Sequence, residues 1–145
     1  MLLRDIITRE MYWLRPGDTL ARAVSLFRRS KIDTLPVLDE DMRLHGVFTR
    51  SSLYDAMLAG ASLQDSIAPR VIRDPVTVPA EISYEELTHM VRGSPVGTAP
   101  VVDAENRVVG ILTKQDMVMA ALRQTDLLNA QLRATLNAMH NGLIA

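Results

Sequence analysis

Several features are missing from this sequence, and each absence removes a class of function. The chain has no cysteine, which excludes disulfide bonds and thiol chemistry and is compatible with a reducing cytosol. Aromatic residues make up only 4% of it, so we expect an aliphatic, methionine-rich core. The formal net charge is -1, which gives no bulk electrostatic reason to bind nucleic acid or an anionic membrane surface.

Long apolar runs are also absent. No segment approaches the ~18–20 apolar residues of a membrane-spanning helix. The N-terminus reaches Arg4 and Asp5 without the apolar stretch of a signal peptide. With 145 residues, 48% hydrophobic and 23% charged, the chain fits one compact domain or two half-domains that share a core. We therefore expect a cytoplasmic protein with no membrane partner.

Patterns for catalysis and metal binding are lacking as well. The sequence has no acid/base set beside a nucleophile and no glycine loop that would cradle phosphate, so we expect no enzymatic activity. Its three histidines, His45, His89 and His140, are scattered and have no cluster of carboxylates around them. We therefore expect no metal site.

What the sequence does contain is a repeat. Thr34–Asp39 (TLPVLD) is matched by Thr98–Asp103 (TAPVVD), and Leu44–Thr49 (LHGVFT) by Val108–Thr113 (VVGILT). Both matches have the same offset of 64 residues (98 − 34 and 108 − 44). A duplication with its blocks in phase indicates two copies of one supersecondary unit that pack on each other. The cleft between two such copies is a natural place for a ligand.

Each copy is predicted to have the order β-α-β-β-α. Two β-branched runs in each copy, 34–38 with 44–49 and 98–102 with 108–113, predict paired strands. Helices are predicted to follow these pairs, over 51–58 and from residue 115 onward. The region of Pro75 and Pro79 is interpreted as the connection into the first strand of the second copy.

Amphipathic patterns place a further helix before each strand pair. In the first copy the i, i+3, i+4, i+7 spacing is carried by Leu20, Ala23, Val24 and Phe27. In the second copy Ser83–Glu86 is a capping box, flanked by Ile82 and Leu87 as a hydrophobic staple. The inward face of this second helix is predicted to consist of Leu87, Met90 and Val91. The arginines that lie between the apolar positions of the first helix, namely Arg22, Arg28 and Arg29, are interpreted as a solvated face.

The C-terminal segment breaks the symmetry of the two copies. After Asp116 the helical pattern continues, with no glycine or proline until Gly142, which predicts a helix of roughly 25 residues, against a mean of ~11–12 in globular proteins. Its apolar positions are Leu122, Leu128, Leu132, Leu136 and Met139. Long helices of this kind usually pair with another helix, so we expect a homodimer.

Two motifs recur in both copies. One is a hydrophobic-Pro-Val strand, Leu35-Pro36-Val37 and Ala99-Pro100-Val101. The other is a Gly-hydrophobic-x-Thr-x-x-Asp turn, complete in Gly110–Asp116 but ending in serine in Gly46–Ser52. With these motifs both copies resemble the CBS domain, the module named after cystathionine β-synthase. The resemblance covers residues 1 to about 122.

The resemblance implies an α/β (α+β) fold in which two repeats pack through their sheets with pseudo-twofold symmetry, followed by a long C-terminal helix. We expect repeats at residues 1–60 and 61–122, and a helical linker at 123–145 that leads into a downstream domain. The last 14 residues resemble the entry into a PAS sensory domain, where a helix runs into a short strand. This second resemblance implies the N-terminal input part of a bacterial multidomain signalling protein, for example one that regulates transcription.

Modules of the CBS family commonly bind adenine nucleotides or related adenosyl compounds between their two copies. The implied ligands are AMP, ADP, ATP or adenosylmethionine, as regulatory ligands and not as required cofactors. The implied ligand-binding residues are Asp74, Val76, Thr77, Val96, Thr98, Ala99, Pro100, Thr113, Lys114 and Asp116. The equivalent residues of the first copy, predicted to form a degenerate site, are Thr34, Leu35, Pro36, Thr49 and Ser52.

Alternatives remain for the residues that matter most. Asp116 either accepts hydrogen bonds from a ribose diol or caps the closing helix through backbone N–H groups. Thr49 has no carboxylate partner at Ser52, which favours bonding between its hydroxyl and the backbone. For the whole chain, a sensor of adenine nucleotides competes with a ligand-free dimerisation scaffold, and the net charge argues against direct DNA binding.

Overall fold

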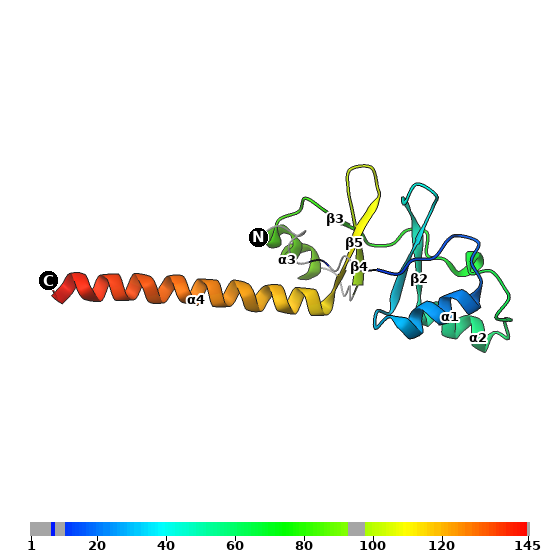
Figure 1. The fold of residues 1–145 in the computed structure, drawn as a ribbon, viewed down its shortest axis with the longest axis horizontal. Coiled ribbons are helices and arrows are strands. Elements are labelled where there is room, and N and C mark those ends of the chain that lie inside the picture. Colours follow the sequence, from blue (N-terminus) through cyan, green and yellow to red (C-terminus); the bar gives the residue numbers. More distant parts are fainter. Residues whose placement is uncertain (1–6, 8–10, 93–97, 145) are drawn as a thin grey trace.

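The computed structural model describes residues 7, 11–92 and 98–144 (Figure 1). Within these residues the strands form a two-stranded and a three-stranded sheet. In chain order the elements are α1 (Leu20–Arg29), β1 (Thr34–Leu38), β2 (Leu44–Thr49), α2 (Arg50–Leu58), the 3₁₀ turn η2 (Ala68–Arg70), β3 (Val78–Pro79), α3 (Tyr84–Arg92), β4 (Thr98–Val102), β5 (Val108–Thr113) and α4 (Lys114–Ile144). The predicted mixed fold of two repeats is confirmed.

The second repeat has the predicted order β3-α3-β4-β5-α4, whereas the described part of the first repeat, from residue 11 on, contains no leading strand of this kind. The corresponding pairing there is a single parallel bridge between Leu14 and Val37. Leu14 N–H donates to the Pro36 carbonyl (2.9 Å), and Leu38 N–H donates to the Leu14 carbonyl (2.8 Å). Pairing stops there because the next residues are Arg15 and Pro16, and proline has no N–H to continue the ladder.

In the second repeat Pro79 belongs to the strand itself. Val78 and Pro79 pair in parallel with β4, as an edge strand of the three-stranded sheet. The interpretation of Pro79 as part of a connection was therefore wrong. A proline is tolerated at this position because an edge strand needs hydrogen bonds on one side only.

The helices begin at side-chain caps. Thr19 accepts a hydrogen bond from Arg22 N–H at the start of α1, and Ser83 accepts one from Glu86 N–H (3.2 Å) at the start of α3. In α1 the buried side chains are Leu20, Ala23, Leu26 and Phe27. Val24, predicted to face inward, is partly buried and packs against the first apolar cluster, and Leu26, which the prediction left out, is buried in it.

In α3 the predicted staple residues Ile82 and Leu87 are both buried. Met90, however, is 38% exposed, so its prediction as an inward residue was wrong. The physical reason is that α3 meets the sheet through its N-terminal end, where Ile82, Tyr84 and Leu87 join the second apolar cluster. The side chain of Val91 lies outside the described residues.

Two apolar clusters form the core, one mainly in each repeat, but Ile67 belongs to the first cluster and Ile7 packs against the second. Both are mainly aliphatic, as the scarcity of aromatic residues predicts. The two phenylalanines, Phe27 and Phe48, both lie in the first cluster with their ring centroids 6.3 Å apart. Arg50 stacks over Phe27 at 5.1 Å and donates to the carbonyls of Phe27 and Ser30, which ties α1 to the start of α2.

The two repeats are joined at the tips of their hairpins by a symmetric pair of hydrogen bonds. Leu44 N–H donates to the Asn106 carbonyl (3.0 Å), and Val108 N–H donates to the Met42 carbonyl (3.1 Å). The two donors, Leu44 and Val108, are equivalent positions of the two repeats, and so are the two acceptors, Met42 and Asn106, since each pair is 64 residues apart (44 + 64 = 108, 42 + 64 = 106). This reciprocity is what a pseudo-twofold axis between the repeats requires.

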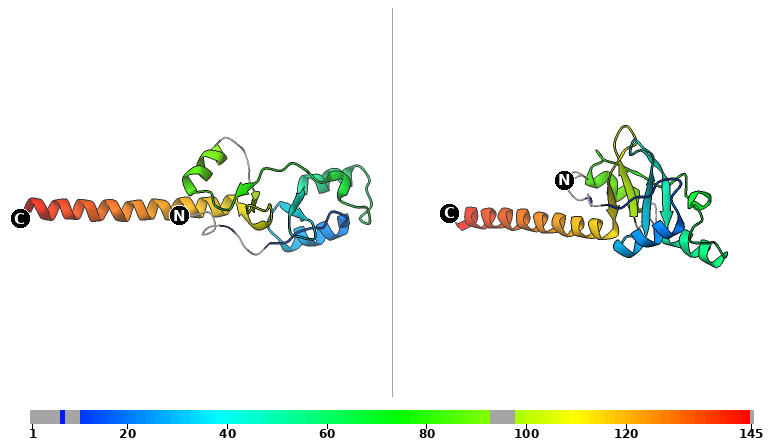
Figure 2. Two further views of the ribbon diagram at one scale, coloured as in Figure 1. Left: turned by 90° about the horizontal axis from the view of Figure 1, so that it is seen from above. Right: turned by 45° about the vertical axis from the view of Figure 1, so that its right-hand side comes forward.

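Helix α4 leaves the second sheet and extends away from both repeats (Figures 1 and 2). It has 31 residues and is continuous across residue 122, where the second repeat was predicted to end. The helix runs through Gly142 to Ile144, so it is longer than the roughly 25 residues predicted, and the short strand implied by the PAS resemblance is not formed there. A glycine costs a helix only about 1 kcal/mol, and a strand needs a pairing partner that the described residues do not supply there. None of the described helices combines the length and apolarity needed to cross a membrane.

Candidate functional site

A cleft of about 350 Å³ opens between the two repeats. One wall comes from the first repeat, at the start of β1 and the end of β2, and the other wall comes from β4. The connecting segment after η2 closes it. The cleft is lined by Asp33, Thr34, Val47, Thr49, Ile72, Asp74, Pro75, Val76, Thr98 and Pro100.

The connecting segment reaches the cleft because it pairs with β2. Val47 and Ile72 form an antiparallel bridge, in which each N–H donates to the other's carbonyl at 2.9 Å. The backbone of the connecting segment passes very close to Gly46, since a Cβ added to this residue would lie 2.5 Å from the Ile72 carbonyl oxygen. Glycine at position 46 therefore allows the chain to pass, and this pairing holds Asp74 and Val76 beside the end of β2.

Asp33 connects the two repeats inside the cleft. Its Oδ1 accepts hydrogen bonds from the Thr34 hydroxyl (3.3 Å) and from the Thr98 hydroxyl (3.2 Å), one from each repeat. Its backbone carbonyl accepts from Arg50 N–H (2.9 Å) at the start of α2. A ligand that contacts these groups would touch both repeats at once.

Six of the predicted site residues line this cleft: Thr34, Thr49, Asp74, Val76, Thr98 and Pro100. Three others, Leu35, Pro36 and Ala99, are buried within strands. Leu35 and Ala99 each follow a lining threonine and therefore point to the opposite face of their strand. The remaining ones that the structure describes, Ser52, Thr77, Thr113, Lys114 and Asp116, are not among the residues that line it. Val96 lies outside the described residues.

The cleft groups the residues differently from the predicted division into two sites. Asp74 and Val76 were grouped with the second repeat's turn at Thr113 and Asp116, but they share this cleft with Thr34 and Thr49 of the first repeat. The physical reason is the Val47–Ile72 pairing, which draws the connecting segment to the first repeat.

The predicted site residues did not include four of the lining residues, Asp33, Val47, Ile72 and Pro75. Asp33 had a usable signal, since it corresponds to Gly97 of the second copy and is a carboxylate present in one copy only (33 + 64 = 97). Val47 and Ile72 had no such signal in the sequence, because an apolar residue in a strand or a connection is first interpreted as part of the hydrophobic core.

The turns into the two closing helices are built alike. Thr113 N–H donates to Asp116 Oδ2, and Asp116 N–H donates to the Thr113 hydroxyl, both at 3.0 Å. In the first repeat Ser52 N–H donates to the Thr49 hydroxyl (3.1 Å), and the two hydroxyls are also 3.1 Å apart. The capping function considered for Asp116 is therefore present, and Thr49 makes the bond between hydroxyl and backbone that was favoured for it.

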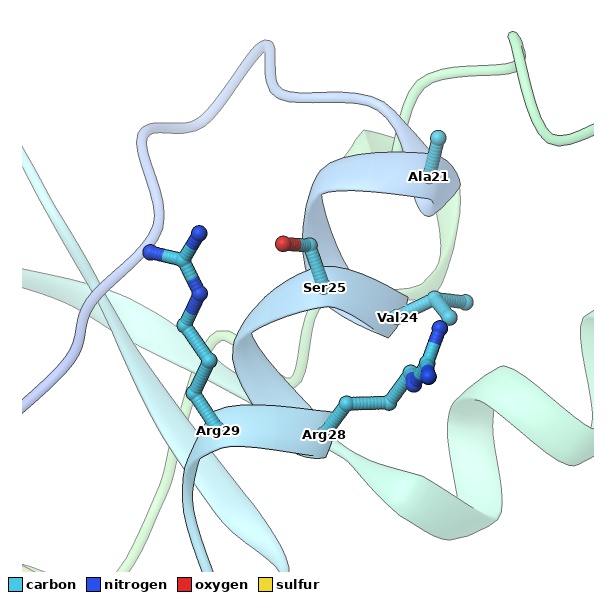
Figure 3. Close-up of a pocket in the computed structure, with 5 residues that line it drawn as sticks. All are labelled: Ala21, Val24, Ser25, Arg28 and Arg29. Atoms are coloured by element: carbon cyan, nitrogen blue, oxygen red, sulfur yellow. The ribbon is translucent and has the colours of Figure 1, made fainter.

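A larger open cavity, of about 510 Å³, lies along α1 and is lined by Ala21, Val24, Ser25, Arg28 and Arg29. Figure 3 shows the guanidinium groups of Arg28 and Arg29 pointing away from each other on opposite sides of the helix. Both side chains are exposed, as expected for a solvated face. The two charges therefore do not converge on one point of this cavity. Among the described residues no group of three or more His, Asp or Glu gathers as a metal site would require.

Comparison with known protein families decides the identity of the fold. The family model of the CBS domain matches the chain twice, at residues 3–59 and 67–123. The chain belongs to the CBS domain family. The two matched ranges cover both repeats, so this protein carries a CBS pair.

Two curated relatives differ in how much of their own length this chain matches. Hypoxic response protein 1 of Mycobacterium tuberculosis is 31% identical over 116 residues, which cover 79% of this chain and 80% of that protein. Inosine-5'-monophosphate dehydrogenase of Methanocaldococcus jannaschii is 25% identical over 114 residues, or 79% of this chain. The chain spans only 22% of that dehydrogenase.

Solved CBS pairs have the same fold. CBSX2 of Arabidopsis thaliana, solved in complex with AMP, superposes with a TM-score of 0.74 at 24% identity, covering 86% of this chain and 98% of that one. The CBS domain pair of protein MJ0100, solved with 5'-methylthioadenosine and S-adenosyl-L-methionine, has a TM-score of 0.73 at 22% identity. That match covers 86% of this chain and 98% of the MJ0100 pair.

Proposed function

We propose that this CBS pair is a regulatory module that binds an adenosine-containing ligand and relays its occupancy to an output domain. The observation that carries the proposal is the cleft of about 350 Å³ between the repeats, spanned by the hydrogen bond from Thr98 to Asp33. Solved CBS pairs of the same fold contain AMP, 5'-methylthioadenosine or S-adenosyl-L-methionine, which supports a ligand of this chemical class. The module itself regulates and does not catalyse.

The lining of the cleft suits a nucleoside. Its apolar members, Val47, Ile72, Pro75, Val76 and Pro100, offer surfaces for the faces of a purine ring. The hydroxyls of Thr34, Thr49 and Thr98 and the carboxylates of Asp33 and Asp74 can bond ribose hydroxyls. The volume lies within the ~300–1,000 Å³ typical of small-molecule sites.

A second site is proposed at the position related by the pseudo-twofold axis. There Asp116 would accept hydrogen bonds from a ribose diol, Thr113 would contact a sugar or phosphate oxygen, and Lys114 would neutralise phosphate. The backbone around Val96, Thr98 and Ala99 would bond the adenine edge. This site keeps the turn motif that the first repeat lacks.

Signal output is proposed to run through α4 in a homodimer. Leu132 and Leu136 of this helix are 58% and 54% exposed, an arrangement that favours a partner helix. The same observation supports the alternative function, a ligand-free dimerisation scaffold. Ligand binding separates the two, because only a sensor binds adenosine derivatives.

A thermal-shift titration tests the proposal. Adenosine, AMP, ATP and S-adenosyl-L-methionine are added to the protein, with guanosine and cytidine nucleotides as controls. A ligand present at 100 times its Kd stabilises the folded state by about 2.7 kcal/mol, which gives a clear shift in Tm. A shift with adenosine compounds alone supports the sensor, and no shift with any of them supports the scaffold.

A further inference from the structure

The charges in the cleft are one-sided. Of the ten lining residues two are carboxylates, Asp33 and Asp74, and none of these described residues is a lysine, arginine or histidine. The lining thus carries two formal negative charges and no compensating cation. Burial of a phosphate normally requires the opposite arrangement, with Arg or Lys or a helix N-terminus directed at the anion.

Cations nearby do not change this balance. Arg73 precedes Asp74 in the chain and Lys31 lies two residues before Asp33, but both side chains are exposed and neither lines the cleft. Arg50, at the start of α2, donates to the carbonyls of Phe27 and Ser30 and stacks on the Phe27 ring. Its guanidinium group is thus held against the first core.

The two carboxylates come from different segments of the lining. Asp33 stands between Thr34 and Thr98, bonded to a hydroxyl of each repeat, while Asp74 comes from the connecting segment. A ligand that fills the cleft therefore lies near two carboxylates. For an adenosine compound the charge of the 5' substituent then decides the electrostatic part of the binding free energy.

We propose that this cleft selects adenosine derivatives whose 5' substituent is uncharged or cationic over those that carry phosphate, with Asp33 and Asp74 as the specificity-determining residues. The inference rests on the proposed function, since it names the ligand class of the same site. Carboxylates can accept hydrogen bonds from ribose hydroxyls and attract a sulfonium or an amine, whereas they repel a phosphate. Both side chains are solvent-exposed, so the effect of each is expected to be a few-fold.

The test compares four ligands at one site: 5'-methylthioadenosine (uncharged 5' group), S-adenosyl-L-methionine (cationic sulfonium), AMP and ATP. Binding is followed by NMR at the backbone amides of Thr34, Thr49 and Val76, which line this cleft and belong to no part of the proposed second site. The expected order of affinity is S-adenosyl-L-methionine and 5'-methylthioadenosine above AMP, and AMP above ATP. The titrations of ATP are repeated with Mg²⁺, which would bridge phosphate and carboxylates.

Substitution of the carboxylates provides the decisive comparison. Asp33→Asn and Asp74→Asn remove one charge each and keep an acceptor oxygen for the neighbouring hydroxyls. Each is expected to raise the affinity for AMP and lower that for S-adenosyl-L-methionine, by about 2- to 5-fold, and to leave 5'-methylthioadenosine nearly unchanged. Asp41→Asn is the matched control, since Asp41 lies at the hairpin tip, beyond the other end of β1, and should change none of the ratios.

The outcomes separate the two levels of the proposal. If AMP, or ATP with or without Mg²⁺, binds this cleft as tightly as 5'-methylthioadenosine, the charge selection is overturned while the sensor function stands. The same conclusion follows if Asp33→Asn and Asp74→Asn leave the AMP affinity unchanged. If no adenosine compound perturbs these amides at millimolar concentration, the cleft is not the site, and the inference is overturned together with this part of the proposed function.

Discussion

Met42 and Asn106 occupy equivalent positions at the tips of the two hairpins and share a left-handed backbone conformation, with φ of 64° and 63°. In each hairpin an aspartate stabilises the turn. Asp39 Oδ1 accepts from Asp41 N–H and Arg43 N–H, and the second copy repeats both bonds, with all four distances at 2.9 Å. The conformation matters beyond the turn, because the carbonyls of Met42 and Asn106 accept the two hydrogen bonds that join the repeats.

The first prediction follows from the tolerance of asparagine for this conformation. Asn106→Ala should lower the free energy of unfolding by about 1 kcal/mol, because a positive φ is sterically unfavourable for alanine, whereas asparagine and glycine tolerate it. Urea denaturation measures the change. Asn106→Gly is the control and should stay close to the wild-type value; equal losses in both variants would show that the side chain, and not the backbone conformation, matters here.

The second prediction concerns the close approach at Gly46. A Cβ at this position would meet the Ile72 carbonyl at 2.5 Å and Val71 Cγ1 at 2.7 Å. Gly46→Ala should therefore force the connecting segment away from β2 and cost about 1–3 kcal/mol of stability, the usual range for overpacking. The displacement should also weaken ligand binding in the cleft, because Asp74 and Val76 follow directly.

Gly17 provides the matched control for Gly46. A Cβ at Gly17 meets nothing within 4 Å. Gly17→Ala should therefore leave both stability and ligand affinity within error of wild type. Thermal unfolding and the NMR titration described above compare the two variants. Wild-type stability in Gly46→Ala would mean that the connecting segment adapts and does not need this pairing.

The strand pairs could be predicted from the sequence because they rest on local information. Two short β-branched runs separated by a few polar residues indicate each hairpin. The copy 64 residues away repeats the same register, with Thr34 opposite Thr49 and Thr98 opposite Thr113. The Val47–Ile72 bridge could not be predicted, because the connecting segment contains no β-branched run long enough to indicate a strand. As this bridge decides which repeat receives Asp74, the composition of the cleft was also beyond sequence reasoning.

Asp116 shows a second limit of prediction from the sequence, because one residue type can serve two functions. An aspartate three residues after a threonine suits a helix cap and a ribose ligand equally well, and the structure shows the reciprocal cap with Thr113. The third prediction treats the two functions separately. Asp116→Ala should lower the free energy of unfolding by about 1 kcal/mol through loss of the cap. It should also weaken ligand binding at the proposed second site by about 10- to 100-fold, the loss expected for a charge-assisted hydrogen bond.

Two measurements separate these effects. Denaturation gives the stability, and NMR titration at the amides of Thr113 and Lys114 gives the affinity of the second site. Ser52→Ala, at the equivalent turn of the first repeat, controls for a change in a turn without a carboxylate. A loss of stability in Asp116→Ala with unchanged affinity would assign Asp116 to capping alone.

The last prediction concerns the exposed apolar face of α4. Val118, Leu122, Leu132 and Leu136 fit alternating steps of four and three residues, the a and d positions of a heptad repeat. The same register places Thr125 at a d position and Asn129 at an a position, so two polar residues lie in the middle of the seam. An asparagine at an a position favours a parallel two-stranded coiled coil in a fixed register. These four apolar side chains are each more than half exposed, at 58%, 55%, 58% and 54%. We therefore expect a parallel homodimer through α4 at micromolar concentration.

Sedimentation equilibrium tests this dimer with three variants. Truncation after Arg123 removes most of the heptads and should give a monomer, as should Leu132→Lys combined with Leu136→Lys, which places like charges in the seam. Ala134→Lys combined with Ala138→Lys adds the same charge at positions outside the seam and should remain dimeric. A dimer that survives both truncation and the leucine substitutions would place the interface on the CBS repeats instead, and ligand occupancy would then reach the partner without help from α4.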